Sequence, residues 1–191
     1  MLCDTNTVCD YSVQNSHFND SVATIKGGAI YYNLYRPLLD KNIFENNQAE
    51  YGNDIGSYPI RIKLKDADSD ELVLDNIVSG QVYMPALQFQ LTDHDDQVVS
   101  TDSYSKIRIS SISNETQVEG VLTSIVNQGV SSFDNLILIA KPGSMNVSYG
   151  ITSSAIDQNI IDLQYKGSVE QQLIDATFRY CESGEIETND Q

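Results

Sequence analysis

Two short acidic segments carry the residue types that could bind a divalent cation. The candidate ligands are their aspartates, Asp66, Asp68, Asp70, Asp93, Asp95 and Asp96. Calcium prefers oxygen ligands, which carboxylates supply. The first segment does not match an EF-hand loop, because Glu71 stands where the turn glycine belongs and Ile77 where the closing glutamate belongs. Two interpretations stay open: a calcium site, or acidic turns whose side chains accept hydrogen bonds from nearby backbone amides.

The groups that catalysis requires do not occur in a catalytic pattern. The two histidines, His17 and His94, have no serine or cysteine motif of nucleophilic catalysis near them. A polysaccharide hydrolase needs carboxylates about 5–10 Å apart, whereas the acids of residues 1–58 are scattered along the sequence. We therefore expect no enzymatic activity and no cofactor. A remnant of a polysaccharide lyase or hydrolase is the least favoured alternative.

Five tyrosines in the first third of the chain could form a platform for a sugar, although packing within the fold is the commoner use of such residues. They are Tyr31, Tyr32, Tyr35, Tyr51 and Tyr58. The alternative function that follows is a module that binds glycans or calcium-dependent partners.

The charge of the chain excludes some classes of partner. Its 27 acidic and 11 basic residues give a formal net charge of −16, which repels nucleic acid and anionic lipid. Arg61, Lys63 and Lys65 alternate with apolar residues, as on the solvent face of a strand. The longest apolar run, residues 136–140, is far shorter than the ~20 residues of a membrane span. We expect no nucleic acid and no direct membrane contact.

Sequons and cysteines favour an oxidising compartment. Asn19, Asn114 and Asn146 each begin a glycosylation acceptor sequence. Cys3 and Cys9 could form a local disulfide, which would leave Cys181 without a partner within this chain.

An internal repeat organises the first part of the chain. Residues 16–23 recur as residues 42–49, so that Phe18 precedes Phe44 by 26 positions, and residues 27–31 recur near 51–55 with a slip of one residue. This period suits one coil of a parallel β-helix, with phenylalanine stacked on phenylalanine and asparagine at the turns. Because a solenoid normally needs about three repeats, we interpret residues 1–59 as the last coils of a right-handed parallel β-helix. Its junction with the next domain is expected at Ile60, Ile62 and Leu64.

From residue 60 the pattern changes to separate strands. Apolar residues alternate with polar ones at 87–91, 106–109, 147–151 and 161–165, and residues 136–139 form a continuous apolar run. Such spacing over 60–181 predicts an immunoglobulin-like β-sandwich, which makes the chain all-β. Residues 168–176 are the single segment expected to be helical. Residues 182–191 are expected to form a disordered acidic tail.

Three stretches together resemble a known family. Residues 27–31 and 44–55 resemble the pectin-lyase-like β-helix coils of large surface proteins from ciliates and other protists. Residues 120–136 resemble the Ig-like domain that follows such coils, and residues 178–185 resemble the start of their cysteine-rich, growth-factor-receptor-like repeats. The resemblance implies a non-catalytic structural or adhesion segment of a membrane-anchored protein. It would lie on the extracellular side of the cell surface, and the partners implied are neighbouring domains of the same chain and surface glycans or proteins.

Overall fold

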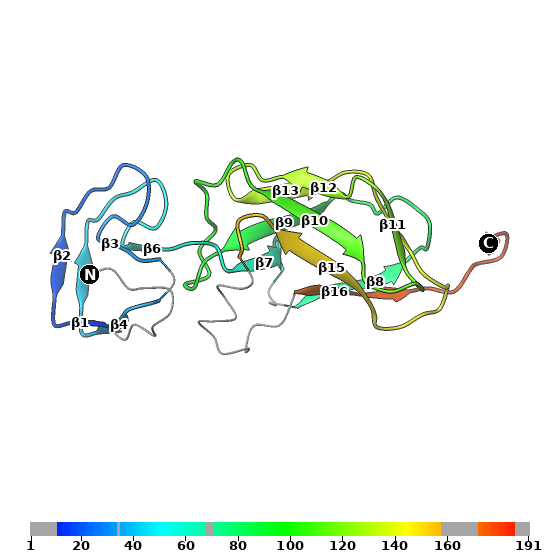
Figure 1. Ribbon diagram of the computed structural model, residues 1–191, viewed down its shortest axis with the longest axis horizontal. Helices are drawn as coiled ribbons and strands as arrows, with labels where there is room; N and C mark the ends of the chain where they lie inside the picture. Colours follow the sequence, from blue (N-terminus) through cyan, green and yellow to red (C-terminus); the bar gives the residue numbers. More distant parts are fainter. Residues whose placement is uncertain (1–10, 34, 68–70, 158–171, 186–191) are drawn as a thin grey trace.

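The computed structural model describes residues 11–33, 35–67, 71–157 and 172–185. Within these ranges the chain is all-β, as predicted, with strands and no helix. No helix in the described residues is long and apolar enough to cross a membrane. The strands of the first 56 residues pair among themselves, and those from Arg61 onward pair among themselves (Figure 1).

Residues 11–33 with 35–36, and residues 37–57, here called the first and second repeats, lie side by side in parallel register. The paired strands are β1 (Ser12–Gln14) with β4 (Leu38–Asp40), β2 (His17–Asn19) with β5 (Ile43–Glu45), and β3 (Ile30–Tyr31) with β6 (Ile55–Gly56). The first two ladders join residues 26 positions apart, and the third joins residues 25 apart. The slip in the sequence repeat is therefore a real change of register, and it falls between the bridges Val22–Gln48 and Lys26–Tyr51.

Side-chain stacking and turn hydrogen bonds hold the two repeats together. The rings of Phe18 and Phe44 stack with centroids 5.1 Å apart and planes 9° from parallel. Asn47, which is buried, accepts the amide of Ser21 at 3.0 Å and donates to the carbonyl of Phe18 at 3.2 Å. Gly28 lies so close to the second repeat that a Cβ there would overlap the carbonyl oxygen of Asn53. These contacts explain why the repeat retains phenylalanine, asparagine and glycine.

The strands from Arg61 onward form a sandwich-like arrangement, here called the sandwich region. One sheet has the order β12-β10-β15-β16-β8, formed by Thr123–Ile125, Lys106–Ser111, Val147–Ser153, Leu173–Phe178 and Leu72–Ile77. The other sheets of this region are β13-β9-β7 (Val130–Phe133, Leu87–Thr92, Arg61–Leu64) and the pair β11-β14 (Gln117–Gly120, Leu136–Ile139). The strands of these sheets share one apolar core.

The core is built from the alternating residues that the sequence predicts. Phe89, Ile107, Ile109 and Tyr149 are fully buried. In β14 the continuous apolar run separates into two faces, with Leu136 and Leu138 fully buried and the intervening isoleucines half-buried. The Tyr149 hydroxyl links β15 to β14 by donating to the carbonyl oxygen of Ile139 at 2.9 Å.

The prediction of a helix at residues 168–176 is wrong for the part of this segment that the structure describes. Residues 173–176 lie in β16, where Ile174, Ala176 and Phe178 alternate into the core. β16 pairs with β15 on one side and with β8 on the other, so it is an interior strand. Its two ladders outweigh the weak helical propensity of the segment. The strand expected at 161–165 lies outside the described residues.

The start of the expected acidic tail has a turn. Glu185 donates its amide to the carbonyl of Glu182 at 3.0 Å, and its carboxylate holds Arg179 at 2.5 Å. The rest of the expected tail, residues 186–191, lies outside the described residues.

Candidate functional site

The acidic loop at residues 93–97 is held by several hydrogen bonds to one buried carboxylate. It follows β9 in the sandwich region, and its first residue, Asp93, is completely buried. The Oδ1 atom of Asp93 accepts the amides of Asp95 at 2.9 Å and Gln97 at 3.0 Å. Its Oδ2 atom accepts the hydroxyl of Tyr51, in the second repeat, and the Nε2 group of Gln97 at 3.2 Å. The carboxylate of Asp93 therefore stabilises its own loop and also accepts a hydrogen bond from the second repeat.

A second set of contacts surrounds Asp95. The guanidinium of Arg36 donates to Asp95 from Nη2 at 2.5 Å and from Nε at 3.1 Å. The Tyr32 hydroxyl donates to Oδ2 of the same carboxylate at 3.1 Å. The hydrogen bonds and charge of Asp95 outweigh burial and raise the pKa of Arg36. Both Arg36 and Tyr32 belong to the first repeat, so the loop contacts both repeats.

One side chain of the loop and one that follows it also bond to backbone carbonyls of the second repeat. Gln97 Nε2 donates to Ile55 O at 2.9 Å, and Ser100 Oγ, just beyond the loop, donates to Glu50 O at 3.4 Å. The ring of His94 lies 5.9 Å from that of Tyr32. Burial and the nearby positive charge of Arg61 lower the pKa of His94, although Asp93 and Asp95 act in the opposite direction. We call this whole set of contacts the junction.

The junction differs from the one expected from the sequence. Ile62 lies in the core of the sandwich region and Leu64 packs against that core, while Ile60 is buried beside them and donates its amide to Thr92 O at 2.8 Å. Neither Gln97 nor Ser100 was predicted to take part. Their positions just after an acidic turn carry no signal that would distinguish them from solvated loop residues.

Three of the six aspartates proposed as calcium ligands have other partners. Asp93 and Asp95 bind the donors described above, and Asp96 pairs with Arg61 at 3.1 Å and with Lys63 at 2.9 Å. The described residues contain no group of three or more acidic, histidine or cysteine side chains placed to hold a metal ion. Within the first segment, Asp66 lies in an exposed turn with φ of 62°, and Asp68 and Asp70 lie outside the described residues. For residues 93–96, the acidic turn that binds backbone amides is the interpretation that the geometry favours.

The tyrosines proposed as a sugar platform are distributed over several roles. Tyr32 and Tyr51 are buried in the junction, where desolvation is the main cause that raises the pKa of both phenols. The Lys26 ammonium lies 4.9 Å from the ring centroid of Tyr31 and 5.1 Å from that of Tyr58, and these two rings contact each other edge to face with centroids 5.9 Å apart. Tyr35 accepts a hydrogen bond from Tyr11 through its backbone oxygen. Tyr58 is 44% exposed, but the five tyrosines are divided among separate contacts and do not form one platform.

The modification candidates are at the surface. Asn19, Asn114 and Asn146 are all exposed. The hydroxyl of Thr116, in the second sequon, contacts Ser111 and Ser113, and the residue is buried. Cys181 is a free, exposed thiol, whereas Cys3 and Cys9 lie outside the described residues.

Comparisons with known proteins add little to this description. No protein-family model matches the chain. No curated protein matches it. A solved structure of WR4, a member of the MSP family from C. elegans, aligns with 64% of this chain and 99% of its own, at 14% identity and a TM-score of 0.33. A similarity this low supports no inference about fold family or function.

Proposed function

We propose that this chain is a non-catalytic structural or adhesion segment of a large surface protein. In this proposal the repeats are the last coils of a right-handed parallel β-helix, and an Ig-like sandwich holds them in a fixed orientation. The observation that carries it is the junction, where the buried carboxylate of Asp93 accepts the hydroxyl of Tyr51 while organising its own loop. A flexible linker between independent modules would not need such a contact.

Parallel pairing over a 26-residue period supports the β-helix part of the proposal. Two of the three parallel strand pairs, β1-β4 and β2-β5, have this period, and the third, β3-β6, joins residues 25 apart. Stacked parallel coils share a core and resist bending, which suits a rod. The proposed location is the extracellular side of the cell surface, in a membrane-anchored protein. The exposed sequons and the charge of −16, which disfavours nucleic acid, support it.

The mechanical part can be tested by calorimetry on the whole chain. We expect wild type to unfold in one transition, because the junction couples the repeats to the sandwich region. Asp93→Ala should split the transition in two, with the repeats melting first. Asp75→Ala, which removes an exposed carboxylate of β8, is the matched control and should leave one transition. Two transitions in wild type, or one transition in Asp93→Ala, would contradict a coupling role for the junction.

The proposed location needs a separate experiment. Antibodies raised against this chain should label intact cells of the source organism, and protease treatment of those cells should remove the signal. Labelling that appears only after permeabilisation would overturn the extracellular assignment without affecting the calorimetric result.

A further inference from the structure

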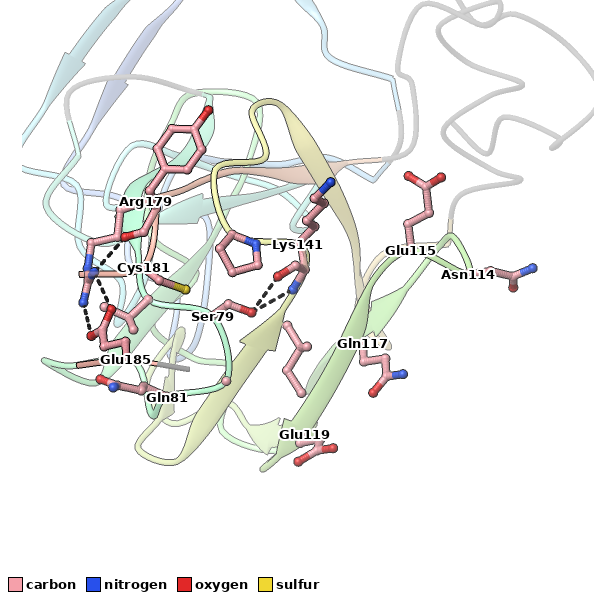
Figure 2. Close-up of a pocket in the computed structure, with 16 residues that line it drawn as sticks. Ser79, Gln81, Asn114, Glu115, Gln117, Glu119, Lys141, Arg179, Cys181 and Glu185 are labelled. Carbon is pink, nitrogen blue, oxygen red and sulfur yellow. Dashed lines mark hydrogen bonds and ion pairs between the residues drawn. The ribbon is translucent and has the colours of Figure 1, made fainter. Parts of the chain in front are cut away.

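A groove of about 1070 Å³ lies at the end of the sandwich region that is remote from the repeats. One wall is β11 with the turn before it, and the opposite wall is the segment that follows β16 (Figure 2). The floor is the end of β14, where Ser79 Oγ bonds the backbone of Ala140 at 2.6 and 3.2 Å. This volume is at the upper end of those that hold small ligands.

The groove concentrates polar side chains that have no partner among the described residues. They come from three separate segments and are Gln81, Glu115, Gln117, Glu119 and Lys141. Gln117 and Glu119 extend from the same face of β11, because alternate residues of a strand point the same way, while Val118 between them packs toward the core. These amides, carboxylates and one ammonium provide both donors and acceptors along the groove.

An aromatic ring stands at the rim of this groove. Tyr180 is 77% exposed, yet its ring is held against the backbone of Gly143, where any Cβ would overlap it. Gly143 has a φ of 79°, a conformation that favours glycine. Close by, Arg179 is engaged by Glu185, through Nη1 at 2.8 Å and Nη2 at 2.5 Å, so it is not available to an anionic ligand.

We propose that this groove binds a neutral oligosaccharide. Vicinal hydroxyls of a sugar match the paired donors and acceptors of amide and carboxylate side chains, and the apolar face of a sugar ring can pack on a tyrosine ring. A polyanionic glycan is disfavoured by the free carboxylates of Glu115 and Glu119 and by the net charge of the chain. This ligand class extends the proposed function. Because the groove lies at the opposite end of the sandwich region from the junction, a failure of sugar binding and a failure of the junction's coupling role can be told apart.

The test uses the whole chain, made without glycans, and four probes: the hexasaccharides of β-1,4-glucose, β-1,3-glucose, β-1,4-mannose and β-1,4-xylose. Two-dimensional NMR titration should show saturable shifts for at least one probe at the amides of Gln81, Gln117 and Lys141. The double variant Gln117→Ala with Glu119→Ala should weaken Kd at least about tenfold, which is about 1.4 kcal/mol. Gln48→Ala with Glu50→Ala, exposed residues of the second repeat with the same spacing and charge change, should leave Kd unchanged.

The rim aromatic gives a second readout. Tyr180→Ala should weaken the same Kd about tenfold, and Tyr180→Phe should keep it within about twofold, because the ring face does the packing. Each of three results would overturn the proposal: no binding of any of the four probes, shifts that map away from the groove, or equal loss of affinity in the groove and control variants.

Discussion

The hydrogen bond between Tyr51 and Asp93 gives the sharpest prediction about this chain. The two residues are 42 positions apart and belong to different regions, yet both are buried and they bond directly. We expect Tyr51→Phe and Asp93→Asn to destabilise the chain and to be strongly coupled to each other. Each substitution keeps the size of its side chain, so the cavity term is small.

The expected magnitude follows from the partners of each group. A hydrogen bond to a charged group contributes about 1.5–3 kcal/mol. Tyr51→Phe removes one of the four donors to the Asp93 carboxylate, and Asp93→Asn retains an oxygen for the amides of Asp95 and Gln97. Once either partner has changed, the charged bond is already lost. The double variant should therefore be about 2 kcal/mol more stable than the sum of the single effects predicts.

Urea denaturation provides the assay. The chain has no tryptophan and 11 tyrosines, so tyrosine fluorescence and far-UV circular dichroism are the two probes. Their transitions must coincide before one free energy of unfolding is assigned, because a chain with two regions can depart from two-state behaviour. Additive effects, within about 0.5 kcal/mol, would refute the view that this bond couples the two regions.

The same pair predicts a response to alkaline pH. Burial, followed by the hydrogen bond and charge of Asp93, raises the pKa of Tyr51 above its ordinary value. The folded chain then keeps this proton above pH ~10, where the unfolded chain loses it. Stability is fully present below that pH and falls as pH rises above it, by about 1.4 kcal/mol per pH unit for one proton. Tyr51→Phe should remove this part of the slope.

Three further predictions concern other contacts. Phe44→Ala should lower the free energy of unfolding, measured by urea denaturation, by about 2 kcal/mol. This is less than the ~3–5 kcal/mol typical of a fully buried ring, because Phe44 is half-buried. Ile43→Ala, on the exposed side of the same strand, is the control and should lower it by less than half as much. The pKa of His94 is lowered in the folded chain. The free energy of unfolding should therefore fall as pH drops below ~6.5, where the histidine of the unfolded chain gains a proton. His94→Gln should make the fall between pH 7.5 and pH 5.5 smaller. Calcium should shift the melting temperature of wild type and of Asp95→Ala with Asp96→Ala by the same amount, since the loop carboxylates bind cationic side chains; a shift lost in the variant would restore the calcium interpretation.

The repeat was predictable from sequence because its contacts join equivalent residues. Phe18 stacks on Phe44, and the slip after residue 23 reappears as a change from 26 to 25 in the ladders. Side-chain alternation likewise identified β9, β10 and β15, since one face of each is buried. A single sequence reveals contacts between equivalent positions of a repeat, and it reveals strands in which every second residue is buried.

The junction was not predictable for the opposite reason. An aspartate that caps its own turn, binds calcium or accepts a distant tyrosine hydroxyl gives the same local pattern. Asp93 meets Tyr51 only because of how the two regions pack, and no periodicity links them. In β16, the alternation of Ile174, Ala176 and Phe178 was present in the sequence, but helix-forming neighbours obscured it.

The hydrogen bonds of β6 show on which side the sandwich region meets the repeats. In the β3-β6 ladder, Asp54 O accepts the amide of Ile30 at 2.9 Å, so this carbonyl points toward the first repeat. Successive carbonyls along a strand point to opposite sides of the ladder. The carbonyl of Ile55 therefore points away from the first repeat, and Gln97 Nε2 donates to it there.

A strand that extended this ladder beyond β6 would need the same carbonyl of Ile55. Gln97 thus takes the position that the next strand of a parallel stack would occupy, and Ser100 does the same at Glu50 O. Unpaired strand edges invite pairing with other chains, so these side chains both block the edge and fix the sandwich region to it. Removing the Gln97 amide would leave the carbonyl of Ile55 unpaired and would also weaken the junction. The same loop therefore covers the free edge of the second repeat and fixes the orientation of the two regions.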